Sequence, residues 1–345
     1  MPHRPVSPSG QRAGLVIKKT FSYEEQTPTP FLCTKENKTI TKKLCRIWGV
    51  NRQTCLAMQP SDFIHPEDAA ALRQMESLPG FAALVKKVLS LGYETLQYGV
   101  NMASAIRLSE KQLPHIYKHL PPICERFGIA EPEFYLQMNP FPNAWTFGDT
   151  RIYVTVTSGL LEMMNDEELD AILAHECGHI LCRHVLYHTI AQWLSGGLSS
   201  LGVLGAVAIP VQYSLFYWSR KSELSSDRAA SIITSPQVVA STMARFSGGP
   251  KSITSQIDFQ EWAKQADEYD KIQNDGLWNK ALQLYAIAGL DHPFSAVRVR
   301  EILKWGESEQ YHAILNGGLT SGKCPHCGNA VDAGWKFCRY CGYKL

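Results

Sequence analysis

The chain has 345 residues, enough for one large domain with attachments or for two domains. With 45% hydrophobic and 19% charged residues it can bury a substantial core, which excludes a wholly disordered or collagen-like protein. The net charge of +2 is unevenly spread: residues 1–52 contain ten Lys and Arg against three Asp and Glu, or +7, so the remainder carries −5. The basic excess is therefore an N-terminal feature and not a binding face on the main domain.

Cysteine usage points to metal binding and away from disulfides. The ten cysteines are too sparse for a disulfide scaffold, and four of them lie in residues 324–345 in paired spacing. The apolar stretch at residues 14–17 is followed at once by two lysines, so it does not predict a secretory signal. We expect metal-bound thiolates in a reducing compartment and a cytoplasmic protein, with peripheral attachment to a membrane as the alternative.

Four segments are predicted in chain order. Residues 1–58 are rich in Pro, Thr and Lys, which predicts a poorly ordered basic extension. Residues 59–316 are expected to form the main domain, and 317–323 a glycine-containing linker. Residues 324–345 form a small terminal module.

Helical periodicity dominates the main domain. Apolar residues recur at helical spacing from about residue 62, and a second helical stretch is predicted over 109–128, bent around Pro121. Helices are predicted again over residues 222–315.

Between these helical regions the apolar period changes to two. Residues 134–138 and 152–157 predict a small strand pair. A further helix is predicted to begin after Asn165, because Glu168 follows it at the spacing of a capping box. We therefore expect an α+β fold that is mainly α-helical, with a short β-sheet.

The predicted helix after Asn165 contains an H-E-x-x-H sequence formed by His175, Glu176 and His179. A spacing of four places both imidazoles on one helix face about 6 Å apart along the axis, which suits two ligands of one zinc ion. Glu176 is placed to accept a proton from a zinc-bound water. A chance match on an ordinary amphipathic helix is the alternative.

Two other histidine pairs have the same spacing. His115 with His119 and His184 with His188 enclose no glutamate, so both pairs are interpreted as exposed or packed helix faces.

A catalytic zinc needs a third protein ligand and an open fourth position. Cys182 and Val185 stand where a metzincin would need glycine and histidine, so that class is excluded. Downstream, Glu223 and Asp227 share a helix face at a spacing of four. Glu223 can complete a His2Glu site, and Asp227 can accept a hydrogen bond from a ligand imidazole. Taken alone, the pair would indicate only a solvated acidic helix terminus.

With these residues in place, the chain resembles the HtpX-like and CAAX-prenyl-endopeptidase family of gluzincin metallopeptidases. The shared pattern is H-E-x-x-H followed by E-x-x-x-D, here at 175–179 and 223–227, and the similarity extends over about residues 63–305. Two further segments are similar to the family's N-A-F and H-P-x-x-x-x-R patterns, namely Asn143-Ala144-Trp145 and His292-Pro293 with Arg298. Trp145 departs from the usual Phe and Cys177 from the usual apolar residue, but neither is a metal ligand.

The resemblance implies a zinc endopeptidase in which residues 143–157 present an edge strand to an extended protein or peptide substrate. Main-chain pairing of this kind gives modest sequence selectivity. The implied substrate-binding residues are Asn143, Ala144, Trp145 and Thr155. His292 is implied as the donor that stabilises the oxyanion, or else as a residue that merely packs before Pro293, and Arg298 as a residue that supports the site.

The terminal module has two C-x-x-C-G knuckles separated by ten residues, which supply Cys324, Cys327, Cys338 and Cys341. Four thiolates close a tetrahedral structural zinc site, and a segment of 22 residues needs metal to fold. The prediction is a zinc ribbon and two zinc ions per chain. The function of the ribbon is interpreted as recruiting a protein partner or selecting substrate. Nucleic-acid contact and a purely structural tail are alternatives.

Residues 189–219 contain no charged side chain, a run of 31 that raises the question of a membrane span. Four glycines and Pro210 interrupt the run, and a spanning hairpin would need two runs of ~20 apolar residues. We expect two short buried helices that gate the cleft and move at Gly196 and Gly197. A membrane-dipping hairpin and a true span are the alternatives.

Two rival functions remain for the chain as a whole. A DNA-associated repair protease of the SprT type also combines H-E-x-x-H with a ribbon, but would place its third ligand closer downstream. A non-enzymatic chaperone or scaffold would keep zinc for stability alone, and the presence of Glu176 argues against it. We expect a zinc-dependent endopeptidase, with protein quality control as its suggested role.

Overall fold

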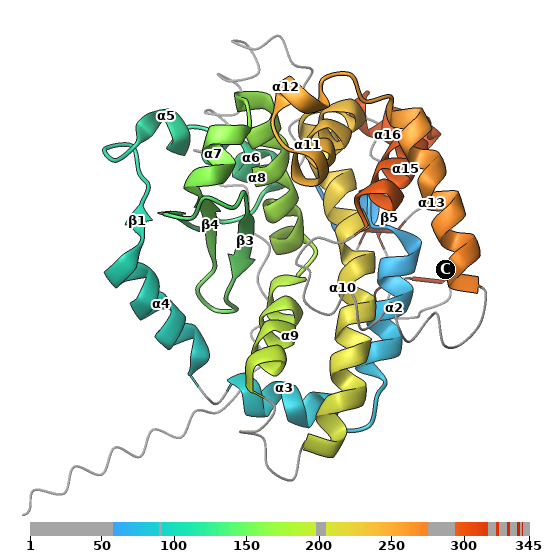
Figure 1. Cartoon of the computed structure of the whole chain (residues 1–345). Coiled ribbons are helices and arrows are strands. Elements are labelled where there is room, and N and C mark those ends of the chain that lie inside the picture. Colours follow the sequence, from blue (N-terminus) through green and yellow to red (C-terminus); the bar gives the residue numbers. More distant parts are fainter. Residues whose placement is uncertain are drawn as a thin grey trace, which may run out of the picture. The chain divides into compact units, whose positions relative to one another are not determined.

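The computed structural model describes residues 58–89, 92–197, 205–274, 294–316, 322–323, 330–331, 337–338 and 340. The predicted basic extension up to residue 57, His292 and three of the four ribbon cysteines lie outside the described residues. The helices are η2 (Pro60–Asp62), α2 (Pro66–Glu76), α3 (Phe81–Leu89), α4 (Tyr93–Ser104), α5 (Pro114–Tyr117), α6 (Leu120–Phe127), α7 (Ser158–Met163), α8 (Asp166–Leu181), α9 (Val185–Gly197), α10 (Gly205–Ile233), α11 (Pro236–Gly248), α12 (Lys251–Thr254), α13 (Phe259–Asn274), α15 (Ser295–Gly306) and α16 (Glu309–Leu315) (Figure 1).

The strands form one four-stranded sheet and one small pair. They are β1 (Ile106–Arg107), β2 (Glu133–Gln137), β3 (Ala144–Phe147), β4 (Tyr153–Thr157), β5 (Gly322–Lys323) and β6 (Ala330–Val331). The strand order of the larger sheet is β1-β2-β4-β3, with β2 and β4 parallel and the other neighbours antiparallel. The predicted α+β, mainly helical class is confirmed, and β1 and β3 extend the predicted strand pair to four strands.

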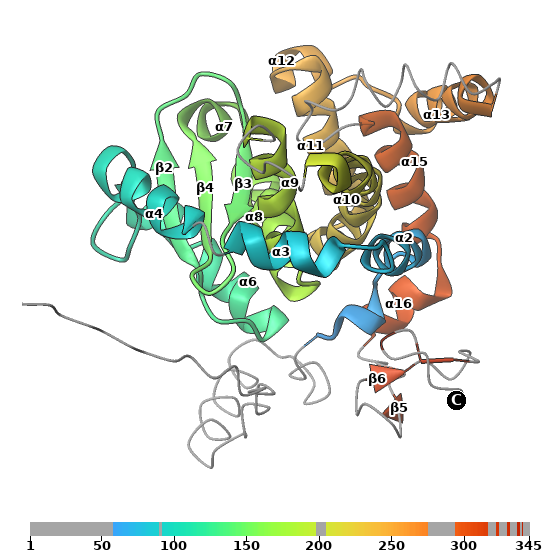
Figure 2. The ribbon, with the colours of Figure 1, turned by 90° about the horizontal axis from the view of Figure 1, so that it is seen from below.

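Helix α8 lies between the sheet and α10 (Figure 2). Its start follows from the sequence: the Asn165 side chain accepts a hydrogen bond from the Glu168 amide at 2.8 Å, and Glu168 accepts one from the Asn165 amide at 3.1 Å. This confirms the predicted capping box. Glu168 also accepts a hydrogen bond from Arg245 of α11 at 3.0 Å, so this buried carboxylate ties two helices together.

The helix predicted over residues 109–128 is divided. Ser109 and Gln112 pair as an isolated bridge, and Leu113 adopts a left-handed backbone with φ 53°, so helix α5 begins only at Pro114. The predicted bend at Pro121 does not occur there, because this proline lies in the first turn of α6, where its missing N–H costs no hydrogen bond.

The uncharged run 189–219 is divided between α9 and the first half of α10. The prediction of two short helices is wrong for the second one: α10 spans 29 residues and continues into the segment that contains Glu223. Buried side chains of both helices pack with α2 and α3 in a second apolar core, whose main members are Met75, Phe81, Leu84, Ile190, Leu194, Val211, Leu215 and Trp218. Among the described residues, no helix is both long enough and apolar enough to cross a membrane.

Candidate active site

His175 and His179 lie one turn apart on α8, and both side chains are buried. Their Nε2 atoms are 3.1 Å apart. Glu223 of α10 faces both of them: its Oε2 lies 3.3 Å from Nε2 of His175 and its Oε1 lies 3.3 Å from Nε2 of His179. The structure thus brings together two residues of one motif with a third from a helix more than forty positions downstream.

The donor atoms of His175, His179 and Glu223 fit a zinc ion. Zn–N and Zn–O bonds of 2.0–2.1 Å in tetrahedral geometry place ligand atoms about 3.3–3.4 Å apart. The observed separations of 3.1 and 3.3 Å are close to this value. Three protein donors leave the fourth position for a water or substrate oxygen, which is the arrangement of catalytic zinc sites.

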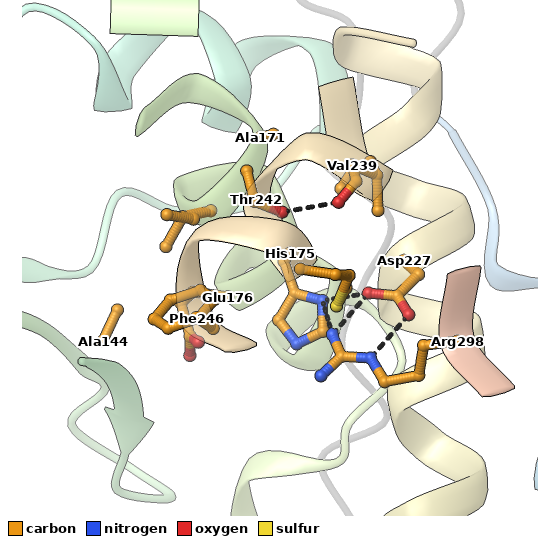
Figure 3. A pocket seen from close by; sticks show the side chains of 12 residues that line it. Ala144, Ala171, His175, Glu176, Asp227, Val239, Thr242, Phe246 and Arg298 are labelled. Atoms are coloured by element: carbon orange, nitrogen blue, oxygen red, sulfur yellow. Dashed lines mark hydrogen bonds and ion pairs between the residues drawn. The ribbon is translucent and has the colours of Figure 1, made fainter. Parts of the chain in front are cut away.

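Asp227 and Arg298 orient the first histidine. Oδ1 of Asp227 lies 3.0 Å from Nδ1 of His175, and Arg298 donates to both carboxylate oxygens of Asp227 at 2.6 and 2.8 Å (Figure 3). Burial alone raises the pKa of Asp227, but the neighbouring Arg298 and His175 outweigh it and hold that pKa below its usual value. An ionised Asp227 favours the neutral tautomer of His175 with its proton on Nδ1, which is the tautomer whose Nε2 can bind a metal ion.

Glu176 lies beside the candidate ligands and is held by the sheet. Thr146 of β3 donates a hydrogen bond from Oγ1 to Oε2 of Glu176 at 2.6 Å, and both side chains are buried. Sequence reasoning missed Thr146. The period of two that predicts strands was the available signal, because it places Thr146 on the same strand face as Ala144.

Three of the predicted substrate-binding residues, Ala144, Trp145 and Thr155, lie in different environments of the sheet. Ala144 of β3 lines the pocket beside Glu176. Trp145, on the opposite strand face, packs with Tyr135, Phe147 and Tyr153. Thr155 lies inside the sheet on β4, paired with strands on both sides and 1% exposed, so it does not belong to the edge strand.

Asn143 precedes the edge strand. Its side-chain oxygen accepts a hydrogen bond from the Ala144 amide at 2.9 Å, and its own amide donates to Oγ1 of Thr157 at 2.9 Å. These bonds fix the start of β3 against β4.

An apolar pocket opens beside His175 and Glu176 (Figure 3). Helices α8 and α11 contribute most of the lining residues, and Ala144 of β3 belongs to the sheet side. The apolar side chains among the lining residues are Ala144, Ala171, Ile172, Ala230, Val239, Met243 and Phe246. The pocket is therefore suited to an apolar group next to the reacting centre.

His184 and His188, interpreted from sequence as an exposed or packed helix face, are packed. His184 is 1% exposed and precedes α9, so the two do not share a helix face as their spacing suggested. Both rings lie against His179, with centroid separations of 5.3 and 4.8 Å.

Of the predicted ribbon, the described residues show only part. Strands β5 and β6 pair antiparallel, and Cys338 is buried. Cys324, Cys327 and Cys341 lie outside the described residues.

The fold and the ligand geometry together define a zinc metallopeptidase. The family model of peptidase family M48 matches residues 110–306, and a zinc-ribbon domain model matches residues 323–345. The chain therefore belongs to peptidase family M48 and is a metalloprotease with a C-terminal zinc ribbon. The resemblance to HtpX-like peptidases is confirmed.

Individual relatives agree with this assignment. The chain is 30% identical over 263 residues to the plastoglobule-localized metallopeptidase 48 of Arabidopsis thaliana, which covers 75% of this chain and 76% of the relative. It is 32% identical over 143 residues to a protease HtpX homologue of Pelotomaculum thermopropionicum, covering 39% of this chain and about half (49%) of the relative. Among solved structures, the crystal structure of S. mikatae Ste24p matches with a TM-score of 0.38 and 14% identity, over 77% of this chain and 66% of that one.

Proposed function

We propose that the chain is an endopeptidase in which His175, His179 and Glu223 hold the catalytic zinc and Glu176 is the general base. The observation that carries the proposal is the cluster of three side chains whose donor atoms approach to 3.1–3.3 Å, with the Glu176 carboxylate beside it. Membership in family M48 supports zinc-dependent proteolysis and makes the SprT-type alternative unnecessary.

The division of labour follows from the contacts. Zinc, when bound, supplies Lewis-acid activation of a water molecule and of the scissile carbonyl. Glu176 accepts the proton of the attacking water on its carboxylate and returns it to the leaving amine. Thr146 holds that carboxylate toward the reacting centre. Asp227 and Arg298 keep His175 in the tautomer that binds metal, and His292 is the proposed oxyanion donor.

The proposed substrate is an extended protein or peptide segment. We place it along β3, the last strand in the sheet order, because Thr146 links this strand directly to the catalytic base. The main chain of Asn143, Ala144 and Trp145 would align the substrate, and the apolar pocket would accept one of its apolar side chains. Recognition of this kind is tolerant of sequence, which suits a role in protein quality control.

Helix α9, and not the whole segment 189–219 expected from the sequence, is proposed to gate the cleft. The second part of that segment is continuous with the ligand-bearing helix α10 and packs in the second apolar core. Helix α9 also packs in that core, but in addition it contacts the end of β3, where the Gly148 amide donates to Oγ1 of Thr189 at 3.3 Å. Shortening α9 at its Gly196-Gly197 end should raise peptidase activity without loss of protein from the supernatant.

The remaining proposals concern the terminal module and the location. We propose main-domain limits of 59–316, a linker over 317–323 and a ribbon of 324–345 that binds a second zinc through its four cysteines and recruits a protein partner. The cytoplasm is the proposed location. A plastoglobule-localized relative makes peripheral attachment to a lipid surface the alternative, and high-salt extraction of the membrane fraction would separate the two.

The Glu176→Gln variant tests the function. The amide keeps the shape of the side chain and leaves the ligands in place but cannot accept a proton, so cleavage of a denatured test protein should fall by at least ~100-fold with zinc content unchanged. Glu167→Gln, the same change on the exposed face of α8, is the control and should retain activity. Wild-type cleavage by Glu176→Gln would refute the mechanism, and a wild-type protein that cleaves nothing would favour the scaffold alternative.

A further inference from the structure

His184 is brought to His179 by the way helix α8 ends. The amide of Arg183 donates to the Ile180 carbonyl at 3.1 Å, and the amide of His184 donates to the His179 carbonyl at 2.9 Å. These two bonds form a Schellman motif, which usually has glycine at the position of Arg183. Here Arg183 adopts the left-handed backbone, φ 60°, without being glycine. The chain reversal places His184 against the ligand one turn earlier on the helix.

The contact between the two imidazoles is direct. Nδ1 of His184 lies 3.1 Å from Nδ1 of His179, the ring nitrogen that does not face Glu223. On its other side, Nε2 of His184 lies 3.1 Å from Oδ2 of Asp68. Both His184 and Asp68 are almost completely buried, at 1% and 0% exposure, so water does not compete for these contacts.

Asp68 belongs to α2, which lies along α10 (Figure 1). Its carboxylate accepts hydrogen bonds from Nε1 of Trp218 at 2.9 Å and from Oγ of Ser225 at 2.6 Å, both on α10. These donors fix the carboxylate so that one oxygen also faces His184. Helix α2 precedes residues 110–306, which the family model matches, so this part of the arrangement comes from outside that region.

The proton positions follow from the contacts. If Nε2 of His179 binds zinc, the neutral ring carries its proton on Nδ1. That N–H must donate to Nδ1 of His184, which therefore has no proton. The proton of neutral His184 is then on Nε2, the nitrogen that lies 3.1 Å from Oδ2 of Asp68. Each step leaves one tautomer, and together they define an ordered relay from the ligand to a buried carboxylate.

We propose that His184 and Asp68 are positioning residues for the second zinc ligand, doing for His179 what Asp227 and Arg298 do for His175. The proposal rests on the proposed zinc site. Removing such a partner of a ligand imidazole typically costs about 10- to 100-fold in metal affinity, because the ring loses its fixed orientation and tautomer.

A structural role alone would give a different result. Asp68 also holds α2 on α10 through Trp218 and Ser225, and a carboxylate that only anchored two helices would affect stability but not zinc affinity. The test therefore measures zinc affinity and the stability of the zinc-free protein separately, in the full chain.

The variants are Asp68→Asn and His184→Gln, with Asp170→Asn as the matched control. Asp170 of α8 contacts His119 at 2.6 Å, so the control breaks a histidine–aspartate pair that does not contact the proposed ligands. Zinc affinity is measured by competition with a chromogenic chelator. The zinc that a His179→Ala variant fails to bind defines the active-site pool and separates it from ribbon zinc.

We expect Asp68→Asn and His184→Gln to weaken binding of that pool by about 10- to 100-fold, and the double variant to be no weaker than His184→Gln alone, because both act through one ring. Asp170→Asn should bind zinc like the wild type. Wild-type affinity in both relay variants, with a lower melting temperature only, would overturn the relay and leave the site intact. If His179→Ala itself loses no zinc, the proposed site is wrong instead.

Nitrogen-15 spectra of the zinc-loaded wild type give a second measurement that does not depend on the folding of a variant. The relay requires the proton of His179 on Nδ1 and that of His184 on Nε2. A His184 protonated on Nδ1 would contradict it.

Discussion

The zinc-site cluster and the second apolar core lie along the same helix but are built differently. The zinc-site cluster, which comprises His175, Glu176, His179, Glu223, Asp227 and Arg298, buries polar and ionisable side chains from α8, α10 and α15. The second apolar core packs the first half of α10 against α2, α3 and α9 with aliphatic and aromatic side chains. Helix α10 thus has an apolar half and a half that carries the proposed ligand Glu223.

A single substitution has different consequences in the zinc-site cluster and in the second apolar core. A buried charge without its partner is strongly unfavourable, so each member of the zinc-site cluster depends on specific neighbours. A truncated apolar side chain leaves only a cavity that the surroundings partly fill. Changes in the cluster should therefore alter zinc binding or rate as well as stability, while changes in the second core should alter stability alone.

Arg298→Met should have the largest effect on stability. Arg298 is the cation beside two buried carboxylates, with Nη1 3.1 Å from Glu223 and two hydrogen bonds to Asp227. Its loss should destabilise the zinc-free protein by about 3–5 kcal/mol, and bound zinc should recover part of this because it supplies positive charge. Urea unfolding with and without zinc measures both values.

Arg300→Met, on the same helix α15, is the control for this prediction. Arg300 pairs with the more exposed Asp267 and Asp270, so its loss should cost at most about 1 kcal/mol. Equal losses in the free energy of unfolding for the two variants would show that Arg298 compensates the buried carboxylates no more than a surface ion pair would.

Leu215→Ala tests the second apolar core. Leu215 is completely buried, and its truncation should lower the free energy of unfolding by about 2–5 kcal/mol while the zinc affinity of the folded protein stays unchanged. Leu96→Ala, at a position 63% exposed, should have little effect. A reduced zinc affinity in folded Leu215→Ala would mean that the two halves of α10 are energetically coupled.

Thr146→Val should slow catalysis without removing zinc. The variant loses the 2.6 Å hydrogen bond that orients Glu176, so kcat should fall on the order of 10-fold with KM little changed. Thr155→Val makes the same change in β4, where the hydroxyl has no hydrogen-bond partner among the described residues, and should keep wild-type kcat. If the two variants have the same kcat, the Thr146 bond does not position the base.

The last prediction concerns pH and His65, the N-cap residue of α2. Burial and the nearby Arg228 lower the pKa of His65 to about 4, so the folded state favours the neutral ring. As pH falls from 6.5 toward 4 the unfolded chain binds the proton first, and stability is lost by at most about 1.4 kcal/mol per pH unit from this group. Above pH 6.5 the group has no effect.

In thermal unfolding between pH 7 and 4.5, His65→Gln should therefore show a shallower decline in stability than the wild type. His312→Gln, on an exposed face of α16, should follow the wild-type curve. An identical decline for His65→Gln and wild type would show that other groups account for acid destabilisation.

Local patterns predicted the elements whose causes lie within a few residues. The capping box of Asn165 and Glu168 fixed the start of α8, and alternating residues predicted β2 and β4. Predictions that depended on distant contacts were less accurate. The helix expected over 109–128 is divided by a left-handed Leu113, and the two short helices expected over 189–219 include half of the long α10.

For the site, the spacing of four alone placed His175 and His179 on one face, and the E-x-x-x-D pattern identified Glu223 and Asp227. Motif spacing contains no information about which other side chains reach these residues. Thr146, His184 and Asp68 escaped prediction because each contacts the site across a gap in sequence or through an unusual turn.

The sequence by itself determined the chemical identity of the protein, since H-E-x-x-H, E-x-x-x-D and paired C-x-x-C-G are local patterns whose meaning depends on residue type and helical or turn geometry. Only the tertiary structure decided which strand faces Glu176, how α10 joins the apolar core to the proposed metal ligands, and that α2 brings a buried carboxylate to His184. The physical reason is that hydrogen bonds and charge compensation act over about 3 Å in space. Packing brings such atoms together from any distance along the chain.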